Sequence, residues 1–227
     1  MNSIKVIGFD ADDTLWVNGT YFSEAEASFC ALMSKYMPEK ELTDELFRTE
    51  MQNMECYGYG AMAYTLSLIE TALKISEEKV QANVIAEILK LGRSLLSKPI
   101  ELFPGVKEVL PFLQEKYRLI VVTKGDLLDQ ERKLEKSGLL PYFHHIEVVS
   151  EKRESNYLHL INVLNILPEE FLMVGNSLKS DVIPVLAIGG KAVHVPFSTV
   201  WKHESAEKPS TPYIEIQSLV DLPGLLF

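Results

Sequence analysis

Short apolar runs that stop abruptly at polar residues recur along the chain. The first run, residues 4–9, brings Val6, Ile7 and Phe9 together and ends in the sequence Asp-Ala-Asp-Asp. Runs of the same design follow at residues 119–122, 146–149, 171–174 and 192–195. Short runs rich in β-branched residues are typical of strands that are buried on both faces of a parallel sheet. The pattern therefore predicts five buried strands.

Helical patterns lie between these predicted strands. Asp126 can cap a helix that ends at Gly138, residues 154–164 carry apolar side chains at helical spacing, and residues 181–188 stop at a glycine pair. Strands and helices of this length that alternate along a chain form a parallel sheet with helices on both faces. We therefore expect an α/β fold with a Rossmann-like, doubly wound parallel sheet as its core.

One long interval departs from this alternation. Residues 23–97 contain four helical patterns and no convincing strand, and Ser23, Thr43 and Ser76 are the expected helix starts. Lys98-Pro99 then forms a hinge that returns the chain to the core. The sequence predicts an inserted α-helical cap domain over residues 17–98 and a core formed by residues 1–16 and 99–227.

Composition narrows the class of protein. The chain has 227 residues and 47% hydrophobic content, which is enough for one well-filled core and a smaller domain. Its 32 acidic and 22 basic residues give a net charge of -10, so a nucleic-acid partner is disfavoured by repulsion. No run is long enough for a signal peptide or a membrane span. We expect a cytoplasmic monomer without a membrane partner.

Two cysteines, Cys30 and Cys56, lie far apart in the sequence. Neither belongs to a short-spaced pair or lies near a group of histidines, so the sequence does not support a disulfide framework, a zinc site or a thiol redox motif. Both are expected to be packing residues.

Polar clusters follow four of the predicted strands. In an open parallel sheet, ligands bind beyond the carboxyl ends of the strands, so these clusters are candidates for a single site. Carboxylates, a hydroxyl group and cations are what metal-assisted phosphoryl transfer requires. The candidate residues are Asp10, Asp12, Asp13, Thr14, Thr123, Lys124, Ser150, Lys152, Arg153, Asn176, Ser177, Lys179 and Asp181.

The order and spacing of these clusters resemble the four motifs of the haloacid dehalogenase-like hydrolases. The resemblance rests on residues 9–15 (FDADDTL), residues 121–123 (VVT), Lys152, and residues 175–181 (GNSLKSD). A helical insertion directly after the first motif is similar to the first type of cap in that family. The resemblance covers the whole core.

The resemblance implies a two-step phosphoryl transfer. Asp10 would attack phosphorus and become an aspartyl phosphate, which divides one difficult displacement into two easier ones. Asp12 would protonate the leaving oxygen and then deprotonate the attacking water. Family members that remove halide from carbon lack this second aspartate, so Asp12 favours phosphoryl transfer.

The resemblance also assigns the groups around the phosphate. Thr123 would donate a hydrogen bond to the phosphoryl group, with Lys124 beside it as a substrate contact, and Lys152 would offset the charge of the nucleophile and the transferring oxygens. Arg153 is an alternative to Lys152, since the two residues are adjacent.

Magnesium is the implied cofactor, with Asp10, the Asp12 carbonyl, Asn176 and Asp181 as the implied ligands. Asn176 departs from the family pattern, because an acidic residue usually stands at that position. An amide oxygen can bind a hard cation, but one negative charge is lost. We therefore expect weaker magnesium binding.

The insertion is expected to act as a lid that excludes water and provides specificity. Tyr57 and Tyr59 are separated by a glycine and followed by another, so they can contact the leaving group of the substrate from a flexible loop. The alternative is that both rings are packing residues.

Each polar cluster taken alone has a simpler interpretation as a turn, a helix cap or a solvated surface. Their joint pattern favours a magnesium-dependent phosphatase that acts on a small phosphorylated metabolite. A phosphomutase is an alternative that returns the phosphoryl group to the substrate. The departure at Asn176 keeps open a second alternative, a catalytically impaired protein that binds a phosphorylated ligand.

Overall fold

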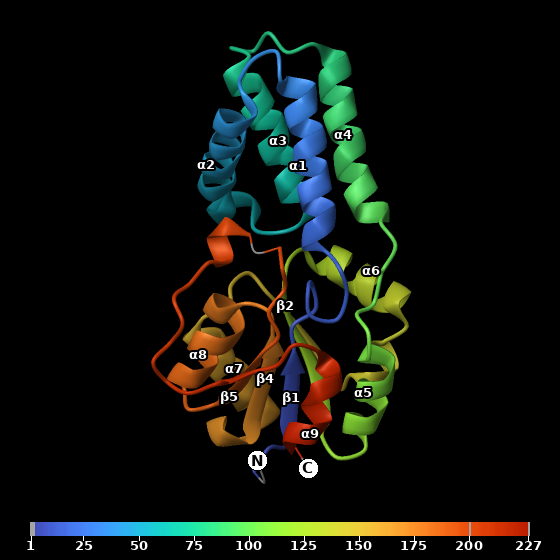
Figure 1. Cartoon of the computed structure of the whole chain (residues 1–227), viewed down its shortest axis with the longest axis vertical. Coiled ribbons are helices and arrows are strands. Elements are labelled where there is room, and N and C mark those ends of the chain that lie inside the picture. The colour runs from blue at the N-terminus through green and yellow to red at the C-terminus, as the bar shows by residue number, and fades with distance from the viewer. Residues whose placement is uncertain (1–2, 200, 227) are drawn as a thin grey trace. The chain divides into compact units, whose positions relative to one another are not determined.

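The computed structural model describes residues 3–199 and 201–226 and divides the chain into two compact units (Figure 1). The core unit comprises Met1–Gly19, Ile100–Lys124 and Gln130–Phe227. The helical unit comprises Thr20–Pro99 and Gly125–Asp129.

The core unit is built on a parallel sheet with the strand order β3-β2-β1-β4-β5-β6. The strands are β1 (Val6–Phe9), β2 (Arg118–Lys124), β3 (His145–Val149), β4 (Phe171–Gly175), β5 (Lys191–His194) and β6 (Ile214–Glu215). In the centre of the sheet, Val6 of β1 lies opposite Arg118 of β2 and Phe171 of β4. The predicted α/β fold with a doubly wound parallel sheet is confirmed. The sequence missed β6, because two residues are too few to form a recognisable apolar run.

Helices cover both faces of this sheet. They are α5 (Val106–Gln114), α6 (Leu127–Ser137), α7 (Glu154–Leu164), α8 (Ile183–Ala187) and α9 (Leu222–Leu226). Helix α8 follows directly on a π-helical turn, η3 (Leu178–Val182), so the helical segment starts before the predicted residue 181.

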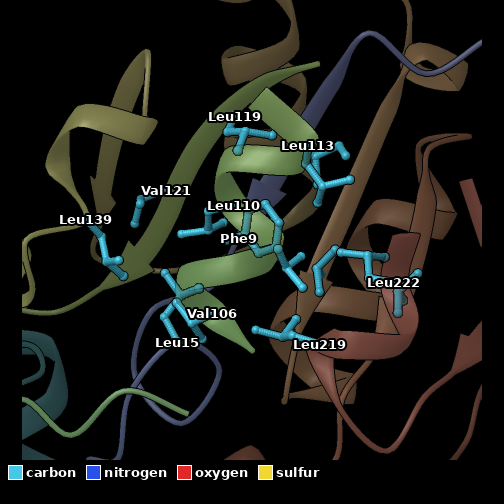
Figure 2. Close-up of a cluster of buried hydrophobic side chains, with 14 of the residues drawn as sticks. Phe9, Leu15, Val106, Leu110, Leu113, Leu119, Val121, Leu139, Leu219 and Leu222 are labelled. Carbon is cyan, nitrogen blue, oxygen red and sulfur yellow. The ribbon is translucent and has the colours of Figure 1, made fainter. Parts of the chain in front are cut away.

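Alternate residues of each strand face opposite layers of the core, as the two-residue period of a strand requires. Ile7 and Phe9 pack with Leu119 and Val121 of β2 against α5 and α9, and Figure 2 shows part of this layer around Phe9. The opposite layer contains Val6 from β1 together with residues of α7 and α8. The central strands are therefore buried on both sides, which explains why they read as continuous apolar runs.

The helical unit contains α1 (Gly19–Met33), α2 (Glu39–Tyr57), α3 (Ala61–Ile75) and α4 (Ala82–Ser97). The predicted helix starts are wrong: Ser23 and Thr43 lie inside α1 and α2, and Ser76 follows the end of α3, where its hydroxyl accepts a hydrogen bond from the amide of Val80. Within residues 3–199 and 201–226, no helix combines the length and apolar character needed to cross a membrane.

The four helices share an apolar core of their own. Phe29, Met33, Leu46 and Leu68 are buried within it. Cys30 also packs there, as predicted, whereas Cys56 is exposed, so its prediction as a packing residue is wrong.

Gly92 marks a close approach between α3 and α4. A Cβ atom at this position would lie 2.1 Å from Oγ1 of Thr65 and 2.9 Å from its Cβ atom. The contact involves the base of a short side chain, so it cannot be relieved by a rotation alone. The absence of a side chain at Gly92 therefore sets the distance between the two helices.

We expect Gly92→Ala to lower the free energy of unfolding by about 1–3 kcal/mol, because overpacking outweighs the higher helix propensity of alanine. The matched control is Gly224→Ala in α9, where a new Cβ atom meets nothing within 4 Å and should be neutral or slightly stabilising. Urea unfolding of both variants checks the difference. A stabilised Gly92→Ala protein would show that the helices separate freely.

Candidate active site

Polar residues of the core unit converge at the carboxyl ends of β1, β2, β3 and β4. The strand order changes direction between β1 and β4, because the chain proceeds from β1 to β2 and β3 on one side and to β5 and β6 on the other. Such a switch point, with loops diverging on either side, is where open α/β sheets bind their ligands.

Lys152 joins two buried carboxylates at this point. Its ammonium group donates to Oδ1 of Asp10 at 2.5 Å and to Oδ1 of Asp181 at 2.7 Å, and its side chain is 1% exposed. Arg153, the alternative that the sequence left open, is exposed and precedes the first turn of α7. The structure therefore brings Lys152, and not Arg153, to Asp10.

The burial of this trio shifts its pKa values. Burial raises the pKa of Asp10 to about 7 against the opposing effect of Lys152, and the charge of Asp181 raises it further. Burial alone would lower the pKa of Lys152, but the two carboxylates raise it above its ordinary value. With both carboxylates ionised, the trio carries one uncompensated negative charge.

Asp181 is held by the backbone as well as by Lys152. The amide of Ser177 donates to its Oδ2 atom at 3.0 Å. A Cβ atom on Gly175 would lie 2.2 Å from the same oxygen, so the last residue of β4 must be a glycine for the carboxylate to lie against it. The π-helical turn η3 carries Asp181 over this strand end, and such turns recur at functional sites.

Asn176 and Asp10 face the same hydroxyl group. Oγ1 of Thr14 lies 3.1 Å from Oδ2 of Asp10 and 3.3 Å from Oδ1 of Asn176. One hydroxyl proton cannot fully satisfy both oxygens, so acceptor capacity remains on this pair. Behind them, Nε2 of His194 lies 3.0 Å from the carbonyl oxygen of Asn176, which ties that loop to β5.

This pair of oxygens suits a hard cation such as magnesium, which prefers carboxylate and amide oxygens and retains several waters. The uncompensated charge of the trio favours a cation as well. Across the described ranges 3–199 and 201–226, no group of three or more His, Cys, Asp or Glu side chains is placed to hold a metal. The amide at Asn176 is consistent with that finding, since this position contributes an oxygen without a charge.

Both oxygens of Asp181 already accept hydrogen bonds. The role of Asp181 as a direct metal ligand therefore stays a prediction, and it would require one of these hydrogen bonds to break.

Asp12 is oriented by residues that the sequence analysis did not single out. Its carboxylate accepts hydrogen bonds from Trp16, Gln130 and Lys133 at distances between 2.7 and 3.1 Å. Trp16 is four residues further along the chain, and the other two lie on α6. The chain carried no signal for these partners beyond a polar pair at helical spacing, because their meeting depends on the tertiary fold.

A further unpredicted residue, Glu204, lies beside the end of β2. Its carboxylate pairs with Lys124 and accepts hydrogen bonds from the hydroxyls of Ser177 and Ser180, both at 2.6 Å. Burial alone would raise the pKa of Glu204, but Lys124 and these hydrogen bonds lower it to about 2. Glu204 is the last residue of a short 3-10 helix, η4 (Lys202–Glu204), between β5 and β6, where no sequence pattern predicts a contact.

Of the other predicted residues, Thr123 and Asp13 lie in the core unit, and Tyr57 and Tyr59 lie in the helical unit. Thr123 is buried at the end of β2, and its hydroxyl donates to the carbonyl of Lys124 at 3.2 Å. The carboxylate of Asp13 accepts hydrogen bonds from the amides of Asn18 and Gly19, so it shapes the turn after β1. Tyr57 lies in the helical unit and donates to Glu70 at 3.0 Å. Tyr59 lies between α2 and α3 of that unit.

Comparisons with known proteins agree with the motif resemblance. A family model described as a haloacid dehalogenase-like hydrolase matches residues 4–189. The crystal structure of a haloacid dehalogenase-like family hydrolase from Xanthomonas campestris is similar to this chain, with a TM-score of 0.89 and 38% identity, covering 99% of this chain and 91% of that one.

Curated relatives also match the full length of the chain, and they include two proteins named as phosphatases. The N-acylneuraminate-9-phosphatase of Mus musculus is 25% identical over 246 residues, which cover 100% of this chain and 95% of that protein. The glyceraldehyde 3-phosphate phosphatase of Pyrococcus furiosus is 24% identical over 233 residues, which cover 100% of this chain and 93% of that protein. The two are named for different phosphorylated compounds.

The contacts of Glu204 predict a specific pH dependence of stability. Because its folded-state pKa of about 2 lies below the ordinary 4.5, the stabilisation is complete above about pH 4.5 and is lost as the pH falls towards 2. We expect Glu204→Gln to lower the free energy of unfolding at pH 7 by about 1–3 kcal/mol, since Lys124 loses its counter-charge. The difference in the free energy of unfolding between Glu204→Gln and wild type should become smaller as the pH falls.

Urea unfolding at several pH values between 7 and 3 measures both effects. Glu207→Gln is the matched control, because Glu207 is exposed in the same segment. A deficit that is independent of pH would mean that the charge of Glu204 does not contribute.

Proposed function

Because the chain belongs to the haloacid dehalogenase-like hydrolases, we propose that it is a phosphatase that hydrolyses a small phosphate monoester through an aspartyl phosphate on Asp10. The observation that carries the proposal is the position of Asp10, a buried carboxylate paired with Lys152 at the switch point of the sheet. Two full-length relatives named as phosphatases support the same class of reaction.

In the first step, a carboxylate oxygen of Asp10 forms a bond to phosphorus while the bond from phosphorus to the ester oxygen breaks. Asp12 gives its proton to that leaving oxygen. Lys152 stays charged beside Asp10 and stabilises the oxygens of the transferring group. Thr123 and Lys124, which follow each other at the end of β2, hold the phosphoryl group.

In the second step, water attacks the phosphorus of the aspartyl phosphate and Asp12 takes the proton. The bond between Asp10 and phosphorus breaks, which releases inorganic phosphate and restores both carboxyl groups. Asp12 thus acts first as an acid and then as a base, because it loses its proton in the first step and takes one from water in the second.

Magnesium is the proposed cofactor, and Asp10, the Asp12 carbonyl, Asn176 and Asp181 would hold it. When bound, it would offset negative charge on the phosphoryl oxygens and on the nucleophile. Asp10 must be ionised to attack, and its raised pKa means that a neighbouring cation would increase the reactive fraction near neutral pH. We propose that Asp181 supports this arrangement by fixing Lys152.

The helical insertion, residues 17–98, is proposed as the cap that provides specificity. Tyr57 and Tyr59 remain its proposed substrate contacts, and Tyr57 would have to exchange its hydrogen bond to Glu70 for one to the substrate. The relatives are named for two unlike compounds, so the proposal for this chain stops at a small phosphorylated metabolite handled in the cytoplasm.

We expect Asp10→Asn to retain the fold and lose at least 10³-fold in turnover, because an amide cannot form the covalent intermediate. Phosphate release from a panel of alkyl and aryl phosphates, with and without magnesium, measures this loss. Asp221→Asn is the matched control, since it makes the same change at an exposed residue. Full turnover by Asp10→Asn would remove Asp10 from its assigned role.

Asn176→Asp should strengthen magnesium activation by about tenfold, because the substitution restores a negative charge next to Asp10 Oδ2. A magnesium titration of the rate compares it with wild type and with Asn162→Asp, an exposed control on α7. An unchanged half-saturating concentration would place residue 176 outside the metal site. If the wild-type protein binds phosphorylated ligands but turns none over while Asn176→Asp does, the alternative of a catalytically impaired protein that binds a phosphorylated ligand holds.

A further inference from the structure

The carboxylate of Asp12 is surrounded by protein donors. Oδ1 accepts from Nε1 of Trp16 at 2.7 Å and from Nζ of Lys133 at 3.0 Å. Oδ2 accepts from Nε2 of Gln130 at 2.9 Å and from the same ammonium group at 3.1 Å. Each oxygen therefore accepts two hydrogen bonds, and the carboxylate has one fixed orientation.

The three donors differ in what they can do. Trp16 and Gln130 are buried, neutral groups, and Gln130 also donates to the carbonyl of Lys124 at 2.8 Å, so it is anchored to the end of β2. Lys133 contacts both oxygens and brings a positive charge. It also has another acceptor, Oδ1 of Asn18, at 3.1 Å.

A general acid needs one oxygen that can approach the leaving group of the substrate. If the ammonium group releases one oxygen of Asp12 and keeps its contact with Asn18, that oxygen has an open acceptor position, while Trp16 on Oδ1 and Gln130 on Oδ2 keep the carboxylate in place. The ammonium group can thus set the orientation of Asp12 without blocking it permanently.

We propose that Lys133 is a positioning residue, which holds Asp12 for proton transfer to the leaving oxygen by bridging its carboxylate and Asn18. This inference rests on the proposed phosphatase activity. It adds a residue on α6 that lies outside the four motifs and acts through Asp12 rather than on the phosphoryl group.

The test exploits the dependence of acid catalysis on the leaving group. An alkyl phosphate needs its leaving oxygen protonated, whereas an activated aryl phosphate such as 4-nitrophenyl phosphate needs little assistance. We expect Lys133→Met to lower kcat/KM for the best alkyl phosphate of the panel by about 10- to 100-fold, since a misplaced catalytic group costs about this much. For the aryl phosphate, kcat/KM should fall less than about threefold, because its leaving group depends less on acid catalysis.

Two variants separate positioning from a general effect on the fold. Lys133→Arg keeps the charge and should recover most of the loss on the alkyl substrate. Lys136→Met makes the same change at an exposed residue of the same helix and should match wild type.

Combining Lys133→Met with Asp12→Asn tests whether Lys133 acts through Asp12. If Lys133 acts through Asp12, adding Lys133→Met to Asp12→Asn should cost no further activity on the alkyl substrate. Equal losses on the two substrates, no loss at all, or a full additional loss in the Asp12→Asn background would each overturn the inference. A wild-type protein that releases phosphate from neither substrate would instead overturn the proposed function.

Discussion

Lys152 places one positive charge between the buried carboxylates of Asp10 and Asp181, and most features of the site follow from that contact. Removing an ionised group from water is costly unless a partner and further hydrogen bonds compensate it. Here the three groups come from three different strand ends, so only the completed sheet can bring them together. Gly175 lets Asp181 lie directly against β4, and the turn η3 supplies the amide that completes its hydrogen bonds.

The charge balance of this trio connects structure to the proposed chemistry. Burial raises the pKa of Asp10 against the opposing charge of Lys152, and the charge of Asp181 adds to the rise. One cation for two carboxylates also leaves a net negative charge, which favours the approach of a further cation. Asn176 provides an oxygen there without adding to the excess charge. A site built in this way would depend on its metal for the ionisation of the nucleophile as well as for substrate binding.

The sequence pattern predicted those features that depend on residues close together in the chain. The central strands and the clusters at their ends were recognisable, because burial on both faces imposes continuous apolar runs. Lys152 and Arg153 could not be distinguished, since side-chain direction after a strand depends on the following turn. Glu204 and Lys133 reach the site only through the tertiary fold. The helix starts at Ser23, Thr43 and Ser76 were misplaced, because capping residues also occur inside helices and after their ends.

The strand order also has a consequence for biosynthesis. β1 leaves the ribosome before both of its neighbours, since the residues that pair with Val6 are Arg118 and Phe171. An apolar segment with two open edges must therefore wait while the helical unit, whose contacts are mostly local, is made and can fold. During that wait, both edges of β1 stay open to wrong pairing.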